Sequence, residues 1–219
     1  QRQPQGLPVA AMSKQLRQRV RAGETIEGEL IQSLDLRGAD LTGAKLLNCR
    51  LLDLRMSGAD LTGADLSGSR FSLCELDGAC LRDADLSDCV FVMTGLAGAC
   101  LAGAKLIRTA LPEVNLRGAD LTGATLYATT LMLADLTDVS FAGLSLEAVM
   151  LSGAELANAD FTGCQLTGCM LKNAKAAGVR FVNATIEQVM FIGADLRGAN
   201  FKGASFDLVN LSEADLRGA

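Results

Sequence analysis

The stretch Ala39-Asp40-Leu41-Thr42-Gly43 decides the fold of this 219-residue chain, and the same five residue types recur at 59–63 and 119–123. From Ile31 to Leu216, every fifth residue is Leu, Ile, Met or Phe, except for Ala176. The residue two positions before each large one is usually small and most often Ala, and no insertion shifts the frame. One unbroken five-residue period therefore organises residues 31–219.

A five-residue period fits neither an α-helix, with about 3.6 residues per turn, nor a continuous strand, whose side chains alternate. It does fit a short strand whose side chains point in, out and in, followed by two residues that turn a corner. Repeated corners in one sense wind the backbone into a solenoid, in which the inward side chains of each coil stack on those of the next. We therefore predict a narrow core of small and large apolar side chains.

These units resemble the consensus of the pentapeptide-repeat family, A(D/N)Lxx, and the resemblance covers residues 31–219. It implies an all-β fold, a right-handed quadrilateral parallel β-helix with four pentapeptides per coil. The repeat then makes about nine and a half coils. At one strand spacing of ~4.8 Å per coil, the rod is roughly 45 Å long.

A second period, of 20 residues, supports a four-unit coil independently. Two columns of corner residues, which begin at Gly38 and Gly43, contain only Gly, Asp or Asn when read every 20 residues. These residues tolerate the positive φ that a type II turn requires at its third position. The other two columns have no such restriction, as Ser33, Leu73 and Met93 show. We predict two faces fixed by turn chemistry and two that vary.

One position breaks the core pattern. Ala176 replaces a large residue, and truncation of a packed core side chain to Ala usually costs about 2–5 kcal/mol. We predict either a void beside Leu156 and Leu196 or compensation by Val179 and Phe181.

The two ends of the repeat differ. Within an N-terminal segment, residues 1–30, we predict an amphipathic capping helix over about 10–22, with Met12, Leu16 and Val20 on one side and Gly23 as its stop. At the other end the chain stops in mid-repeat at Ala219, so we expect the β-helix of 31–219 to belong to a longer protein. An uncovered last coil can also stack end to end with a second copy.

Composition excludes several classes of protein. Hydrophobic residues make up 49% of the chain, but the longest apolar stretches fall short of the roughly 18 residues that span a bilayer. We predict no membrane insertion and a cytoplasmic location in a bacterium, while a secreted effector stays open. A net charge of −5 without a basic stripe argues against direct nucleic-acid binding.

The sequence also offers no candidate residues for catalysis or cofactor binding. The chain has no His, which excludes imidazole-based dyads, triads and metal sites. Its Gly-rich segments have corner spacing and do not resemble phosphate loops. We therefore predict that the protein is not an enzyme, with no catalytic residue, cofactor or metal. Five cysteines occupy the small inward position, where Cys acts as a buried hydrophobe: Cys49, Cys74, Cys89, Cys164 and Cys169.

Two further cysteines face outward. Cys80 and Cys100 lie one coil apart, so their Cα atoms should be ~4.8 Å apart, within disulfide range. A reducing cytosol favours chance neighbours over a disulfide.

The variable faces carry the most distinctive surface. Sorted by coil, their outward positions form an apolar strip, which we predict to bind a protein partner or another part of a longer chain. Exposed apolar patches often mark protein interfaces, and Met adapts well to partners. The alternative is that the repeat tolerates apolar residues at its outward positions at random, without a binding role. The predicted binding residues are Val90, Val92, Met93, Ile107, Tyr127, Met132, Leu133, Met150, Met170, Met190 and Ile192.

Our main hypothesis is a non-catalytic interaction scaffold, which the family resemblance also associates with secretion-associated and effector proteins. The alternative is a DNA mimic that protects gyrase, since such family members carry acidic outward columns. This chain has a partial column at Asp40, Asp60, Asp120 and Asp160. Cys80, Cys100, Ser140, Arg180 and Asn200 interrupt it, and Asp at this position is simply the family consensus.

Overall fold

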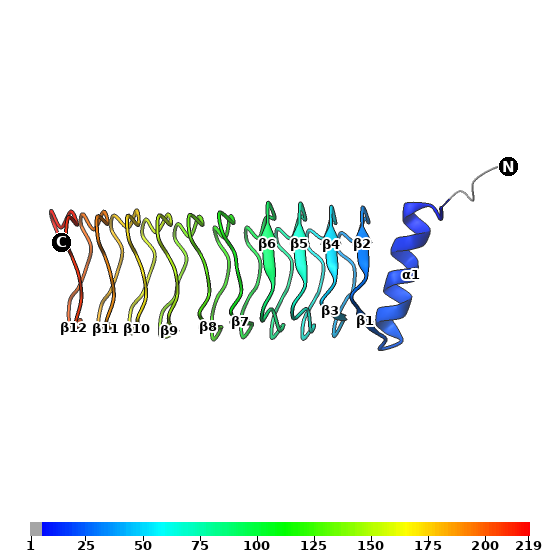
Figure 1. The fold of residues 1–219 in the computed structure, drawn as a ribbon, viewed down its shortest axis with the longest axis horizontal. Helices are drawn as coiled ribbons and strands as arrows, with labels where there is room; N and C mark the ends of the chain where they lie inside the picture. Colours follow the sequence, from blue (N-terminus) through cyan, green and yellow to red (C-terminus); the bar gives the residue numbers. More distant parts are fainter. Residues whose placement is uncertain (1–5) are drawn as a thin grey trace.

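In the computed structural model, which describes residues 6–219, the chain forms a rod of stacked coils with one helix at its N-terminal end (Figure 1). The helix, α1 (Val9–Arg21), lies within one residue of its predicted bounds. Twelve strands of three residues each follow, and all of their pairings are parallel. The strands are β1 (Thr25–Glu27), β2 (Leu30–Gln32), β3 (Lys45–Leu47), β4 (Arg50–Leu52), β5 (Arg70–Ser72), β6 (Val90–Val92), β7 (Lys105–Ile107), β8 (Thr125–Tyr127), β9 (Ser145–Glu147), β10 (Gln165–Thr167), β11 (Thr185–Glu187) and β12 (Ser205–Asp207).

The strand register confirms the four-unit coil. Ile31 pairs with Leu51, Leu51 with Phe71 and Phe71 with Phe91, so each residue lies beside the one 20 positions later. Each coil has four faces, which we name after their first large inward residue. The Ile26, Ile31, Leu36 and Leu41 faces each continue with every twentieth residue. The protein is a parallel β-solenoid of about nine turns.

Layers of nearly identical side chains fill the core. The large inward residues are buried from Ile26 to Leu196, and several Phe rings stack along the rod. The rings of Phe71 and Phe91 lie 4.5 Å apart and nearly parallel, and Phe161 lies between Phe141 at 4.6 Å and Phe181 at 4.9 Å. Such pairs contribute about 0.5–1.5 kcal/mol beyond their buried area.

Ala176 points inward, as its place in the repeat predicts. Ala176, Val179 and Phe181 are all completely buried. The ring of Phe181 meets that of Phe191 edge to face, with centroids 5.6 Å apart. These two rings come from opposite faces of one coil and meet across the core beside Ala176.

The corners differ from the prediction. All four corner columns have positive φ, including the two without a restriction to Gly, Asp or Asn: φ is 55° at Leu73, 48° at Met93 and 58° at Leu133. The left-handed conformation costs an ordinary residue roughly 1–2 kcal/mol. Most corner N–H groups donate a hydrogen bond to the next coil, for example from Leu73 to the Val92 carbonyl at 3.0 Å, which helps offset that cost. The prediction that only two columns need this conformation is therefore wrong.

The corners nevertheless fall into two classes. In the tight class, the residue after the corner donates a backbone hydrogen bond to the large residue three positions earlier, as Ala39 does to Leu36 at 3.0 Å. In the described coils, the corners that follow a strand do not form this bond. The residue after these wide corners is never Ala: it is Glu29, Leu34, Cys49, Leu54, Cys74, Thr94, Thr109, Thr129, Val149, Cys169, Val189 or Val209. The Leu36 and Leu41 faces contain only tight corners over residues 36–219.

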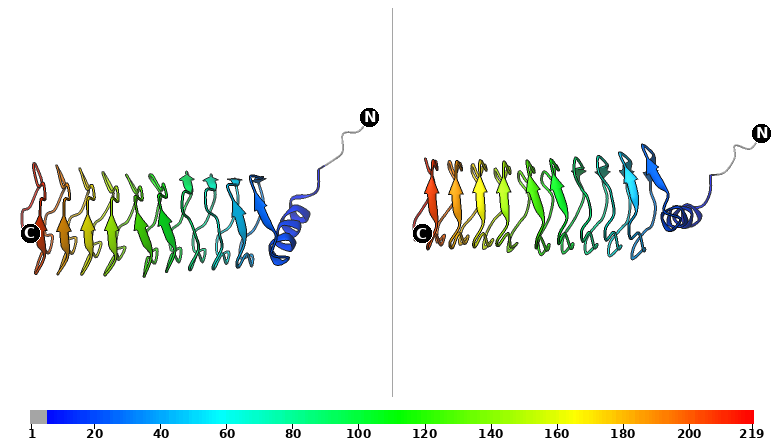
Figure 2. Two further views of the ribbon diagram at one scale, coloured as in Figure 1. Left: turned by 60° about the horizontal axis from the view of Figure 1, so that its bottom comes forward. Right: turned by 90° about the horizontal axis from the view of Figure 1, so that it is seen from below.

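The wide corners change faces along the rod. Strands β2, β4, β5 and β6 form a four-stranded sheet on the Ile31 face, whereas β7 to β12 form a six-stranded sheet on the Ile26 face (Figure 2). A further two-stranded sheet, β1 and β3, lies at the N-terminal end of the Ile26 face, and the strands of the Ile31 face end at Val92, before β7 begins at Lys105. Beyond Val92, the Ile31 face consists of corners and single bridging residues.

The N-terminal helix covers the first coil. Leu16 and Val20 are buried at 5% and 7% exposure and belong to the same core cluster as Ile26 and Ile31. Ile26 already occupies a large inward position, so strand β1 lies before the predicted repeat start at residue 31. The last coil is more open, and Phe206 and Leu216 are exposed there. End-to-end stacking on that coil stays a prediction.

Candidate interaction surface

A ladder of outward side chains runs along the Ile31 face. Successive members lie on neighbouring coils and are joined by parallel backbone bridges from Val90 to Asn210. Three methionines, Met150, Met170 and Met190, follow one another in it, and Met190 is 43% exposed. In chain order, the ladder comprises Leu30, Arg50, Arg70, Val90, Ala110, Thr130, Met150, Met170, Met190 and Asn210.

Corner side chains widen this ladder into a strip. Met93 is 78% exposed, Leu133 56% and Leu73 50%, while Val92 and Ile192 are half-buried beside the ladder. Leu133 also covers the corner of the next coil, since a Cβ built on Gly153 would lie 2.6 Å from its Cδ2 atom. We define the apolar strip as the outward side chains of the Ile31 face from residue 90 to residue 192.

The predicted binding residues divide between two faces. Nine of them lie in the apolar strip, whereas Ile107 in β7 and Tyr127 in β8 lie side by side on the Ile26 face. Tyr127 is 43% exposed. These two side chains therefore lie around a corner from the others, on the six-stranded sheet.

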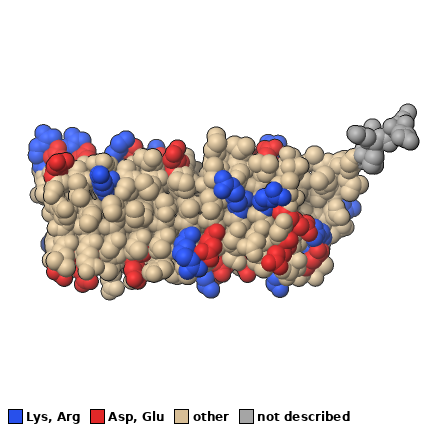
Figure 3. All heavy atoms as spheres, viewed as in Figure 1, with Lys and Arg blue, Asp and Glu red and all other residues tan. Residues whose placement is uncertain are grey.

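Few charges interrupt the apolar strip. Within it, Glu113 and Lys172 are the charged side chains. Figure 3 shows charged side chains mostly along the edges of that view and few over the middle of the C-terminal coils. The Leu36 face differs, because intercoil and intracoil ion pairs cover it, such as Lys175 with Glu155 at 3.0 Å and Arg197 with Asp195 at 2.7 Å.

Two arginines lie at the N-terminal end of the same ladder. Arg50 and Arg70 are register partners in β4 and β5, and both are exposed. Neither forms an ion pair with another residue in the part of the chain that the structure describes. They line a shallow groove together with Leu30 and Leu52, residues that the sequence prediction missed. Reading the 20-residue columns back to residue 30 would have found them.

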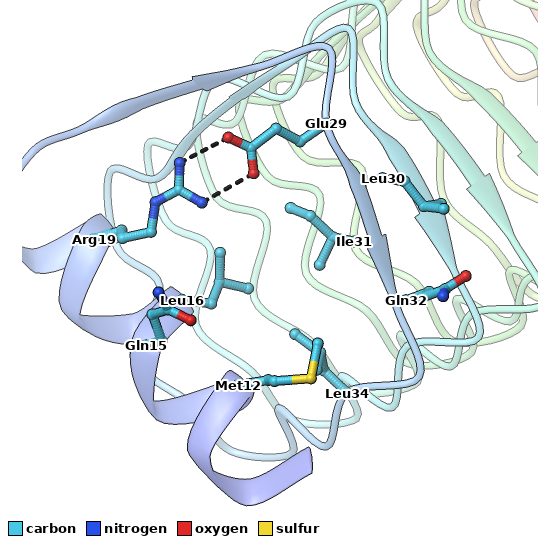
Figure 4. Close-up of a pocket in the computed structure, with 9 residues that line it drawn as sticks. All are labelled: Met12, Gln15, Leu16, Arg19, Glu29, Leu30, Ile31, Gln32 and Leu34. Carbon is cyan, nitrogen blue, oxygen red and sulfur yellow. Dashed lines mark hydrogen bonds and ion pairs between the residues drawn. The ribbon is translucent and has the colours of Figure 1, made fainter. Parts of the chain in front are cut away.

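A pocket of about 250 Å³ lies where α1 meets the first coil (Figure 4). Met12, Leu16 and Leu34 form part of its apolar lining. Arg19 closes one side through two hydrogen bonds to the Glu29 carboxylate, at 2.8 and 2.9 Å. These bonds hold the pKa of Glu29 below its usual value. The pocket is therefore part of the junction between the cap and the β-helix.

The acidic column on the Leu41 face has a local structural role. The Asp60 carboxylate accepts hydrogen bonds from the Thr62 backbone N–H at 3.0 Å and from its hydroxyl at 2.6 Å. Asp120 and Asp160 accept the same pair of bonds from the residues two positions later. The hydrogen bonds from Thr62 lower the pKa of Asp60. The consensus Asp thus helps to fix the corner that follows it.

The five inward cysteines are buried. Burial raises the pKa of each thiol, to about 12 for Cys89 and Cys164 and to about 11 for Cys169. A raised thiol pKa keeps the reactive thiolate scarce. These thiols therefore behave as core side chains.

Within residues 6–219, no group of three or more Cys, Asp or Glu side chains could hold a metal ion. Over the same span, the structure has no helix that is both long and apolar enough to cross a membrane.

The sequence matches two family profiles. One, described as pentapeptide repeats (8 copies), matches residues 35–72, 55–91 and 99–138. The other, described as a pentapeptide repeat region, matches residues 134–219. Together they extend over most of the β-helix. Among curated proteins, none matches the chain significantly.

Solved structures of repeat proteins are similar to this one. HetL, a pentapeptide repeat protein involved in heterocyst differentiation regulation in the cyanobacterium Nostoc sp. strain PCC 7120, is 25% identical. That match covers 91% of this chain and 94% of HetL, with a TM-score of 0.49. A trypsin-treated form of QnrB1, a plasmid-mediated fluoroquinolone resistance protein, is 20% identical. Its match covers 84% of this chain and 91% of QnrB1, also with a TM-score of 0.49.

Proposed function

Because this chain belongs to the pentapeptide-repeat family, we propose that it is a non-catalytic scaffold that binds a protein through the Ile31 face. The apolar strip carries this proposal. It places exposed and half-buried Met, Leu, Val and Ile side chains on successive coils of one face. Contiguous exposed apolar surface of this kind marks interaction sites in soluble proteins.

The direction of the strands restricts how a partner can bind. The strands run across the rod, and each pairs with the coils before and after it, so unpaired strand edges lie only at the two ends. A partner on the Ile31 face therefore meets side chains and cannot add a strand. An amphipathic helix that lies lengthwise along a face is the recognition mode that needs side chains alone.

The dimensions of the strip suit a helix. From Leu30 to Met190 the ladder climbs eight coils, or ~38 Å. That length matches roughly 25 residues of α-helix at ~1.5 Å per residue. Methionine side chains are unbranched and flexible, so they adapt to the apolar stripe of a helix.

Charge complementarity also predicts the direction in which the partner helix lies along the ladder. Arg50 and Arg70 lack intramolecular acidic partners among the described residues, while the rest of the ladder carries no charge. Acidic side chains at one end of the bound helix would pair with these guanidinium groups. The proposed partner therefore carries an apolar stripe that ends in carboxylates, in a separate protein or elsewhere in a longer chain.

Two observations support a non-catalytic role. The sequence has no His, and the buried thiols have raised pKa values. The DNA-mimic hypothesis gains no comparable support, since Asp60, Asp120 and Asp160 are engaged in their own corners. Arg180 also places a positive charge in the same column.

Site-specific photo-crosslinking tests the proposal. A photoreactive residue placed at Met150 in the apolar strip should crosslink, in cells, to the same protein as one placed at Met170. The crosslinked peptides should carry apolar residues at helical spacing. The matched control is Ser145, which lies in the same coil as Met150 but on the Ile26 face. Equal crosslinking of that protein from Ser145 would contradict the proposal.

A further inference from the structure

Two cysteines are neighbours on the outside of the rod. Cys80 and Cys100 form a parallel bridge on the Leu41 face, opposite the Ile31 face, and both are half-exposed. The buried residues Leu81 and Leu101 anchor both coils beneath them. In-register residues on adjacent coils have Cα atoms ~4.8 Å apart. A disulfide accepts Cα separations of about 4.4–6.8 Å.

These cysteines occupy positions that the fold uses for anions. In other coils of the Leu41 face, Asp40, Asp60 and Asp120 stand at this position, and the N–H two residues later donates to their carboxylates. At Cys80 the sulfur takes the place of the carboxylate and faces the N–H of Arg82. A site that favours a negative side chain also favours a thiolate over a thiol.

The neighbours of Cys80 act in the same direction. The Thr62 hydroxyl oxygen lies 3.3 Å from the Cys80 sulfur and also bonds to Asp60. When the Thr62 hydroxyl donates its single proton to the sulfur instead of to Asp60, it lowers the pKa of the Cys80 thiol together with the Arg82 N–H, although burial and the Asp60 charge oppose the shift. Redox-sensitive cysteines combine a low pKa with exposure and a second thiol nearby. Cys80 has a lowered pKa, partial exposure and Cys100 beside it.

We propose that Cys80 and Cys100 form a peroxide-sensitive thiol pair that closes reversibly to a disulfide between two coils. The Cys80 thiolate attacks one peroxide oxygen, the O–O bond breaks, and Cys80 becomes a sulfenic acid while hydroxide leaves. Cys100 then attacks that sulfur, the S–S bond forms, and the sulfenic oxygen leaves as a second hydroxide. With two protons from the thiols, peroxide is reduced to two waters.

The reverse reaction needs a thiol reductant. A thiolate of the glutathione class attacks the disulfide, and a second thiolate completes the exchange, which restores both cysteines. The Leu41 face is not the proposed partner face, so this modification is independent of the proposed function.

Differential alkylation with mass spectrometry tests the proposal on the purified full chain. Near-stoichiometric hydrogen peroxide should remove two free thiols and join the tryptic peptide that ends at Arg82 to the one that begins at Asp83. Dithiothreitol should restore both thiols. The five buried cysteines serve as internal controls and should stay reduced.

Three variants separate the steps. C100S should accumulate a sulfenic acid at Cys80 that dimedone traps, whereas C80S should lose peroxide-driven disulfide formation. T62V removes the hydroxyl at nearly constant shape and should slow Cys80 oxidation several-fold. The proposal would be overturned if peroxide oxidised all seven cysteines evenly or formed disulfides mainly between chains. An unchanged rate of peroxide-driven thiol loss in C80S would also overturn it.

Discussion

The coils before residue 95 and those after residue 105 share one period and one core but differ on two faces. In the first group, the strands β2, β4, β5 and β6 lie on the Ile31 face, beside Arg50 and Arg70. In the second group, the strands β7 to β12 lie on the Ile26 face, and the Ile31 face presents methionines. The Leu36 and Leu41 faces keep tight corners throughout. The comparison shows that a repeat can change its surface without changing its core period.

On the Ile31 face the inward residue after the corner differs between the two groups of coils, whereas Val139 and Val179 follow tight corners on the Leu36 face. Cys74 and Thr94 follow wide corners on the Ile31 face, but Ala134 and Ala154 follow tight ones farther along the same face. On the Ile26 face the order reverses, and the β-branched Thr129 follows a wide corner. β-Branched residues favour extended backbone, whereas Ala lets the coil close more tightly.

The largest expected effect concerns the aromatic stack of the C-terminal coils. Phe161 lies between two rings, whereas Phe71 stacks on one. We expect Phe161→Ala to lower the free energy of unfolding by about 3–5 kcal/mol, and Phe71→Ala to cost less. Denaturant unfolding of both variants measures the difference. An equal or larger loss in Phe71→Ala would contradict the expectation.

A corner exchange tests the cause of the difference directly. Ala134 donates to the Leu131 carbonyl at 3.2 Å in a tight corner, and Val149 follows a wide one. Ala134→Val should cost about 1–3 kcal/mol through overpacking and should speed amide exchange at residue 134 as the bond opens. Val149→Ala is the matched control and should leave exchange at 134 unchanged. Full protection of residue 134 in Ala134→Val would show that the inward residue does not set the corner.

The arginine pair distinguishes the two groups of coils in binding. Arg50→Glu combined with Arg70→Glu should weaken partner binding by on the order of tenfold or more and reduce its dependence on salt. Titration calorimetry at two salt concentrations measures both effects. Lys45→Glu with Lys105→Glu, on the Ile26 face, is the charge-matched control. Equal weakening by both pairs would indicate a nonspecific charge effect.

The smallest expected effect concerns the Leu41 face, which has the same tight corners in both groups of coils. Hydrogen bonds from Thr62 and Thr122 lower the pKa of Asp60 and Asp120, one from each group of coils. A carboxyl with a lowered folded-state pKa stabilises the fold above its unfolded pKa of about 4, and that stability is lost as the pH falls through the folded pKa. Asp60→Asn and Asp120→Asn should therefore reduce the acid sensitivity of Tm slightly and alike. A clear difference between the two variants would break the equivalence of this face.

Much of the fold could be predicted from the sequence because the five-residue period defines the inward positions without ambiguity. Leu41, Leu61 and Ala176 all point inward as expected. The positive φ at Leu73 and Leu133 could not be predicted from their residue types, since closure of the coil and hydrogen bonds to the next coil impose it. The residue type at a corner predicts its backbone conformation only where closure of the coil does not impose that conformation.

The candidate surface could be predicted in part. The 20-residue columns place the methionines of the apolar strip on one face, and they also contain Leu30 and Leu52, which lie on the same face nearer to α1. The same columns place Ile107 and Tyr127 across the neighbouring corner, on the Ile26 face, where they are register partners in β7 and β8.

The central claim is that the apolar strip on the Ile31 face binds the partner. It is tested most directly by the affinity of the purified chain for the protein crosslinked from Met150. Met150→Glu with Met170→Glu should weaken binding about 30- to 1,000-fold, since two central apolar contacts of about 1–2 kcal/mol each would be lost. Ser145→Glu with Gln165→Glu, in the same two coils but on the Ile26 face, should change the affinity no more than about twofold. Equal affinities of the two double variants would contradict the account.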